Sequence, residues 1–160
     1  MTGLIARYEA LVAAGELRPD AEQAAAAERL ERLQRELEAA SASGGFLGKL
    51  MGRKRQRPRG VYLWGGVGRG KSMLMDLFHD SLRIAEKRRV HFHAFMLEVH
   101  ALLRDERKKE AVDPILPVAA TLARDLKVLA FDEMVVNNSA DAMIMSRLFT
   151  ALMMQEGVTI

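Results

Sequence analysis

The apolar positions near the N-terminus recur at helical spacing. They predict two helices, with breaks at Gly15 and around Pro19. Asp20 followed three residues later by Gln23 has the pattern of a capping box, in which two side chains satisfy backbone amides at a helix start. The second helix then presents one apolar stripe, formed by Leu30, Leu33 and Leu37. This stripe needs another apolar surface to pack against.

From Val61 onward, short apolar runs alternate with helical patterns. Strands are predicted at 61–64, 89–96 and 128–131, and helices at 70–84, 97–109, 117–124 and 140–155. Gly157 ends the last helix, and β-branched residues that begin a further strand follow it. Strands that alternate with helices are typical of a parallel sheet covered on both faces. We therefore expect an α/β fold with an N-terminal helical extension.

Composition divides the chain into three regions: a helical region at 1–45, a basic linker at 46–60 and the α/β core at 61–160. The linker ends in a run of Arg and Lys between Arg53 and Arg59. Such a run can bind nucleic acid or an anionic membrane surface, but this one has no interleaved aromatic residues. A solvated loop is the favoured interpretation, and a nucleic-acid partner is not expected.

The overall composition is that of a globular domain. Of the 160 residues, 49% are apolar and 28% are charged, and the net charge is +3. No apolar run approaches the roughly 20 residues of a membrane-spanning helix. Arg7 and Glu9 interrupt the place where a secretory signal would have its apolar core. The absence of cysteine excludes disulfides and thiolate metal sites, so we expect a cytoplasmic protein without a membrane span.

Residues 65–72, GGVGRGKS, match the phosphate-loop pattern G-x-x-x-x-G-K-[ST] between a predicted strand and a predicted helix. Glycine allows the loop to wrap a phosphate closely, and the helix start adds its amides and positive dipole end. We expect Lys71 to reach the β- and γ-phosphates and Ser72 to bind Mg²⁺. The predicted nucleotide-binding residues are Gly65, Gly66, Val67, Gly68, Arg69, Gly70, Lys71 and Ser72.

Two other interpretations of this loop are less favoured. A glycine-rich turn that binds nothing rarely carries the complete pattern between a strand and a helix. A dinucleotide-binding loop would have no use for the Lys71-Ser72 pair, and no acidic residue follows at the expected interval on a second strand.

The apolar run 128–131 ends in two carboxylates, Asp132 and Glu133. In a P-loop protein such a strand lies beside the strand of the loop, so Asp132 is expected to hold Mg²⁺ through water. Glu133 is expected to polarise the attacking water, and with Lys71 it is a predicted catalytic residue. A second carboxylate directly after the metal-binding aspartate favours hydrolysis over transfer to another substrate. Alone, this pattern is often a plain strand end, but the preceding loop favours the functional interpretation.

Beyond these motifs, the chain resembles the ZapE-like family of P-loop ATPases, the bacterial relatives of the AFG-type mitochondrial ATPases. The resemblance covers most of the chain. It is carried by YLWGGVGRGKS at 62–72, MDLF at 75–78, RRVHFHAFM at 88–96, DP at 113–114, LPVA at 116–119, FDE at 131–133 and ADAMI at 140–144. The phosphate loop is generic, whereas HFHAFM and ADAMI are close to diagnostic.

This resemblance implies an AAA+-like P-loop fold, action on ATP with Mg²⁺, a homo-oligomer at full length and, in bacteria, association with the division machinery at the septal ring. Two departures matter. At 134–138 the family usually has phenylalanine-glutamine-valine-threonine-aspartate, and here MVVNN stands there, with Asn137 and Asn138 at its end. In relatives, the strand that begins at Val158 would run into a segment with the sensor asparagine. The chain thus resembles a fragment without the later strands and lid, and its exposed sheet edge predicts low solubility.

Four further side chains have alternative interpretations. His91 and His93 are expected on one face of a strand, and His100 follows them, which invites a metal site. Zinc takes three or four ligands and no cysteine is present, so a structural or phosphate-sensing role is favoured. Arg147 could act on the nucleotide of a neighbouring subunit, but a salt bridge or a solvent-exposed position is favoured.

The leading hypothesis is therefore Mg²⁺-dependent binding and hydrolysis of ATP. The alternative is a nucleotide-dependent binding or assembly module. A chain without its sensor and arginine finger should bind ATP but hydrolyse it very slowly. A nucleic-acid motor is a weaker third hypothesis that rests only on the basic run.

Overall fold

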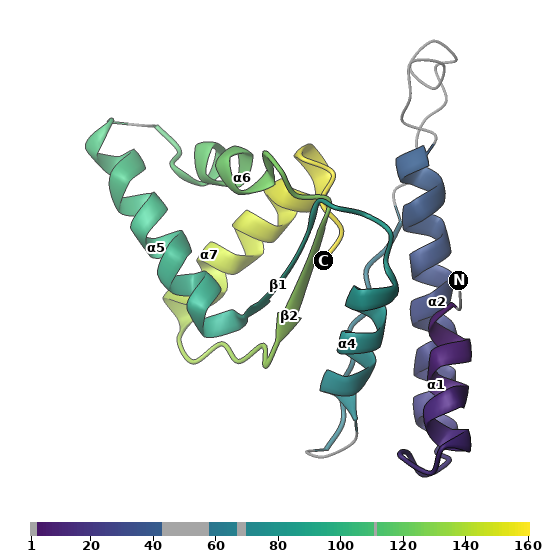
Figure 1. The fold of residues 1–160 in the computed structure, drawn as a ribbon. Helices are drawn as coiled ribbons and strands as arrows, with labels where there is room; N and C mark the ends of the chain where they lie inside the picture. Colours follow the sequence, from purple (N-terminus) through teal and green to yellow (C-terminus); the bar gives the residue numbers. More distant parts are fainter. Residues whose placement is uncertain (1–2, 43–57, 67–69, 111) are drawn as a thin grey trace. The chain divides into compact units, whose positions relative to one another are not determined.

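The computed structural model describes residues 3–42, 58–66, 70–110 and 112–160 (Figure 1). The chain forms two compact units, residues 1–85 and residues 86–160. The boundary between the units falls inside the region expected to be the α/β core. The division at 45 and 60 follows composition alone, and it stays a prediction.

The first unit contains the helices α1 (Leu4–Ala13), α2 (Ala21–Ala42) and α4 (Lys71–Ser81). Gly15 adopts the left-handed conformation (φ 74°) after α1, which a glycine tolerates without a steric penalty. Asp20 caps α2, because its Oδ1 accepts hydrogen bonds from the amides of Glu22 (2.8 Å) and Gln23 (3.1 Å). The two N-terminal helices and the break between them are confirmed.

The apolar stripe of α2 is buried, as the pattern predicts. Leu30, Leu33 and Leu37 are 2%, 4% and 5% exposed. Polar side chains of the same helix satisfy the ends of its neighbours: Glu31 Oε1 accepts from the amide of Ile5 in α1 (3.3 Å), and Gln34 Nε2 donates to the carbonyl of Ser81 in α4 (2.9 Å). Both α1 and α4 are therefore attached to α2 by packing and by hydrogen bonds.

The second unit is built on the parallel strands β1 (Lys87–His91) and β2 (Val128–Asp132). In their register, Arg89 lies opposite Ala130 and His91 lies opposite Asp132. On the other edge of β2, the amide of Leu129 donates to the carbonyl of Thr159 (2.9 Å), and the amide of Thr159 donates to the carbonyl of Lys127 (2.9 Å). Thr159 thus forms one isolated parallel bridge with Val128, at the place where the sequence predicts the beginning of a strand.

The helices of this unit are α5 (Phe92–Lys108), α6 (Ile115–Ala123) and α7 (Ser139–Thr150), which continues into a π-helical turn (Ala151–Gln155). All of them lie on one side of the two strands (Figure 1). Within this unit, the expectation of a parallel sheet covered by helices is met for one face.

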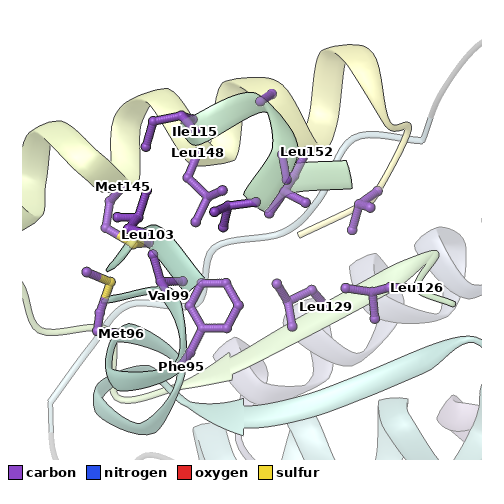
Figure 2. Packing of buried hydrophobic residues seen from close by; sticks show 14 of the residues in the cluster. Phe95, Met96, Val99, Leu103, Ile115, Leu126, Leu129, Met145, Leu148 and Leu152 are labelled. Carbon is purple, nitrogen blue, oxygen red and sulfur yellow. The ribbon is translucent and has the colours of Figure 1, made fainter. Parts of the chain in front are cut away.

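The core of the second unit lies between these helices and β2. Phe95 and Val99 of α5, Leu129 of β2, and Leu148 and Leu152 at the end of the chain point toward one another there (Figure 2). The buried positions of α5 follow helical spacing, which is why this segment folds as a helix. They are Phe92, Phe95, Met96, Val99 and Leu103.

The prediction of a strand at 89–96 followed by a helix from 97 is wrong. β1 ends at His91 and α5 begins at Phe92. The alternation of histidine and phenylalanine in HFH resembles a strand, but Phe92, Phe95 and Met96 have the i, i+3, i+4 spacing that buries one helix face. His93 therefore lies in α5, and it does not share a strand face with His91.

The prediction of a strand at 61–64 is also wrong for the structure described. Residues 58–66 form no helix or strand, and Tyr62 and Trp64 are 73% and 84% exposed. A strand requires a partner whose backbone completes its ladder, and these residues have none in the described sheet, which pairs β1, β2 and Thr159. The following helix, expected to reach residue 84, ends at Ser81, because Leu82 is extended (ψ 120°).

Candidate nucleotide-binding site

Two glycines of the phosphate loop adopt conformations that favour glycine. Gly65 has φ 149° and Gly70 has φ 77°. Gly70 directly precedes α4, and in the described part of the chain no side chain caps this helix at Gly70. The helix start therefore presents backbone amides and the positive end of the helix dipole beside the loop. Val67, Gly68 and Arg69 lie outside the described residues.

Lys71 folds back over the loop. Its Nζ donates to the carbonyl of Gly65 at 2.5 Å and lies 3.4 Å from the carbonyl of Gly66. An ammonium group held by carbonyl oxygens of its own loop is in a position to exchange them for oxygens of a bound anion. Ser72, the next residue of the pattern, is exposed in the first turn of α4.

A contact that the sequence did not indicate joins α2 to this loop. A Cβ placed on Gly70 would lie 2.8 Å from Nε2 of Gln23. Sequence reasoning assigned Gln23 to the capping box, and the structure bears out the Asp20 half of that box. No sequence signal distinguishes a glutamine that caps its own helix from one that also lies against a loop far along the chain.

Gly70→Ala is expected to reduce the free energy of unfolding by about 1–2 kcal/mol, because alanine is strained at a positive φ, and to weaken ATP binding about tenfold. Gly15→Ala is the matched control. Gly15 has nearly the same φ (74°), and no atom lies within 4 Å of its added Cβ. Thermal unfolding should show a loss for both variants, and the loss for Gly70→Ala should be the larger one because its Cβ also displaces the Gln23 side chain. Binding of a fluorescent ATP analogue should weaken only for Gly70→Ala. Equal binding by the two variants would mean that the conformation of Gly70 does not matter to the ligand.

The acidic pair lies at the end of β2 in the second unit. Asp132 is its last residue, and Glu133 is exposed with φ 51°. A left-handed conformation costs a non-glycine residue about 1–3 kcal/mol and is common at functional sites. Glu133 therefore turns the chain sharply out of the strand and leaves its carboxylate in solvent.

Asp132 is held by an arginine that sequence reasoning missed. Arg89 of β1 donates from Nε to Oδ2 at 2.8 Å and from Nη2 to Oδ1 at 3.1 Å. The preceding residue, Arg88, pairs with Glu98 of α5 instead (Nη1 to Oε1, 3.1 Å). The hydrogen bond with Glu98 raises the pKa of Arg88 above its ordinary value, against an opposing effect of burial. The sequence shows two adjacent arginines, but only the strand register reveals which one meets Asp132.

Aromatic packing fixes the end of β2. The ring of Phe131 lies 4.8 Å from that of Phe95 and 5.9 Å from that of Phe92, both edge to face, and it stacks on Phe149 at 5.5 Å between centroids. Since Phe131 directly precedes Asp132, this cluster holds the backbone from which the carboxylate projects.

The segment after the acidic pair leads into a capped helix. Asn138 Oδ1 accepts from the amide of Asp141 at 2.7 Å, and its Nδ2 donates to Oδ2 of Asp141 at 2.8 Å. The second carboxylate oxygen of Asp141 lies 2.9 Å from Nε2 of His100 in α5. Asn138, which departs from the family pattern, is thus the N-cap of α7.

The other candidate side chains are dispersed within the second unit. His91 and His93 are exposed at the end of β1 and the start of α5, and His100 pairs with Asp141. Arg147 forms a salt bridge with Asp113 (2.6 Å), which confirms the interpretation favoured from the sequence, a salt bridge or a solvent-exposed position.

Most of the basic run, residues 53–57, lies outside the described residues, and Arg59 is exposed.

The two residues predicted to bind Mg²⁺ both carry side-chain oxygens. In the ranges that the structure describes, no group of three or more His, Asp or Glu side chains is placed to hold a metal ion. Mg²⁺ does not require such a group, because it usually binds one or two protein oxygens together with phosphates and water. The hydroxyl of Ser72, in the first unit, and the carboxylate of Asp132, in the second, are donors of that kind.

None of the helices described within residues 3–42, 58–66, 70–110 and 112–160 has both the length and the apolar character needed to cross a membrane.

Curated relatives match most of the chain. Cell division protein ZapE of Escherichia coli (strain K12) is 40% identical in an alignment of 157 positions, which covers 91% of this chain and 41% of that protein. An uncharacterized protein of Schizosaccharomyces pombe is 45% identical in an alignment of 100 positions, which covers 60% of this chain and 22% of that protein. Lactation elevated protein 1 homolog B of Danio rerio is 42% identical in an alignment of 104 positions, which covers 59% of this chain and 21% of that protein. The chain thus spans less than half the length of these relatives.

No solved structure matches the chain. The model of one protein family, described as AFG1-like ATPase, matches residues 2–160. A match of this extent agrees with the resemblance carried by the phosphate loop, HFHAFM and ADAMI. The chain belongs to the AFG1-like ATPase family.

Proposed function

We propose that this chain binds ATP together with Mg²⁺ and hydrolyses the ATP. The observation that carries the proposal is the left-handed Gly70 (φ 77°), which is the last glycine of the complete phosphate-loop pattern and directly precedes the first turn of α4. A glycine in this conformation allows a phosphate to approach the amides at the helix start. Membership of an ATPase family supports ATP as the nucleotide.

Each candidate residue has a role in this proposal. Lys71 exchanges the carbonyl of Gly65 for β- and γ-phosphate oxygens, and the glycines of the loop enclose the phosphates. Ser72 and Asp132 contribute oxygens to Mg²⁺, which when bound supplies positive charge at the phosphates. Glu133 orients the attacking water, and its solvent-exposed carboxylate suits that task.

A second candidate function is a nucleotide-dependent binding or assembly module with little turnover. The contact between Gln23 of α2 and Gly70 supports it, because a nucleotide bound in the loop would then change the surroundings of an N-terminal helix. The name of the ZapE relative suggests a partner in cell division, and the family resemblance suggests a cytoplasmic homo-oligomer.

Binding of a fluorescent ATP analogue in the presence of Mg²⁺ tests the proposal. Lys71→Ala is expected to weaken binding about 10- to 150-fold, since a hydrogen bond to a charged group contributes roughly 1.5–3 kcal/mol. Lys108→Ala removes the same charge from an exposed position at the end of α5 and should bind as the parent does. Unchanged affinity in Lys71→Ala would exclude the phosphate loop as the binding site.

A further inference from the structure

Arg89 and Asp132 meet because of the register of the two strands. Arg89 lies opposite Ala130, and Asp132 is two residues beyond Ala130 on β2. Side chains two residues apart on a strand project from the same face of a sheet, so Arg89 and Asp132 are diagonal neighbours on that face. The pairing of β1 with β2 thus brings together two residues that are 43 positions apart in the sequence.

The contact between them is bidentate and shielded. Arg89 donates to both carboxylate oxygens of Asp132, at 2.8 Å and 3.1 Å. The two side chains are only 21% and 14% exposed. A planar guanidinium that holds both oxygens defines the plane of the carboxylate as well as its position. Asp132 therefore has one orientation, fixed by β1.

We propose that Arg89 is a positioning residue, which orients the carboxylate of Asp132 for the Mg²⁺ that accompanies the nucleotide. This inference rests on the proposed function. An ionised carboxylate offers about four lone-pair sites, and the fork of Arg89 uses two of them. The other two remain for water molecules of a hydrated ion. Groups that hold a metal-binding carboxylate in this way commonly contribute 10- to 100-fold to metal affinity.

An opposing effect must be weighed, because a guanidinium repels a divalent cation. Loss of Arg89 removes the fixed orientation of Asp132, so the expected effect on binding with Mg²⁺ is a loss. The variant Arg89→Lys keeps the positive charge and therefore separates the loss of orientation from the change in charge.

Arg88 provides a matched control. It is the adjacent residue of β1, and it also pairs with a carboxylate, that of Glu98 in α5. Successive residues of a strand project to opposite faces, so Arg88 points away from the face of Arg89 and Asp132. Arg88→Gln removes the same charge from the same strand and leaves Asp132 in place.

The experiment compares the parent with Arg89→Gln, Arg89→Lys and Arg88→Gln. Binding of the fluorescent ATP analogue is measured across a series of free Mg²⁺ concentrations and in excess EDTA. Arg89→Gln should raise the Mg²⁺ concentration for half-maximal enhancement of binding about 10- to 100-fold and leave the affinity in EDTA unchanged. Arg89→Lys keeps the charge without the fork, so its Mg²⁺ requirement should be intermediate. Arg88→Gln should behave as the parent does.

The outcomes distinguish a failure of the role given to Arg89 from a failure of the proposed ATP binding. An unchanged or lowered Mg²⁺ requirement in both Arg89 variants, or equal losses with Mg²⁺ and in EDTA, overturns the role of Arg89 and leaves the proposed function standing. Absence of binding by the parent, or binding by Lys71→Ala at parental affinity, overturns the proposed function itself. If Arg89→Gln fails to fold in a thermal unfolding control, the Mg²⁺ requirement of Arg89→Lys alone decides whether Arg89 positions Asp132. This variant is expected to fold because it retains a cation beside Asp132.

Discussion

Replacing Glu133 with glutamine is expected to lower the rate of phosphate release from ATP about 10²- to 10⁴-fold, the usual contribution of a general base. Glutamine has nearly the shape of glutamate but cannot accept a proton from water at neutral pH. The side chain is exposed, so neither folding nor nucleotide binding should suffer. Phosphate release under single-turnover conditions, with protein in excess over ATP, is the appropriate measurement because it detects slow hydrolysis.

Glu110→Gln is the matched control for this variant. Glu110 is also exposed and also left-handed (φ 56°), but it follows α5 and does not end a strand. The same substitution at the same backbone conformation should leave phosphate release unchanged. If both variants hydrolyse ATP at the parental rate, Glu133 has no catalytic role. If the parent binds the analogue but releases no phosphate, the binding or assembly module becomes the better description of the chain.

The acidic end of β2 could be predicted because it depends on local signals. A short apolar run bounded by charged residues predicts a buried strand, and the structure has β2 at Val128–Asp132. The start of α5 could not be predicted in the same way, since His91, Phe92 and His93 fit a strand as well as a helix. Only the burial of Phe95 and Met96 on one face decides between the two-residue period of a strand and the 3.6-residue period of a helix.

The residues that sequence reasoning missed are those whose position depends on tertiary contacts. Arg89 and Asp132 meet only in one strand register, and a shift of β1 by one residue would bring Arg88 to that face instead. Gln23 and Gly70 meet because α2 packs against α4. In the same way, the run at 61–64 has the composition of a strand, but composition does not supply the neighbouring backbone that a ladder requires.

Phe95→Ala is expected to reduce the free energy of unfolding of the second unit by about 3–5 kcal/mol, the usual cost of removing a fully buried phenylalanine ring. Phe95 is 0% exposed, and its ring packs edge to face on Phe131 at 4.8 Å. The loss combines the transfer of apolar surface to water with the cavity left between α5 and β2. Urea denaturation followed by far-UV circular dichroism, extrapolated to water, measures it.

Leu97→Ala on the same helix is the control, because Leu97 is 60% exposed and its loss should cost within about 0.5 kcal/mol. The comparison also bears on the candidate site. Phe131 directly precedes Asp132, so a cavity at Phe95 loosens the strand end from which the carboxylate projects. Phe95→Ala should consequently raise the Mg²⁺ requirement for analogue binding even at temperatures where the variant is folded, whereas Leu97→Ala should not. Equal stability of the two variants would show that the aromatic cluster does not hold β2 against α5.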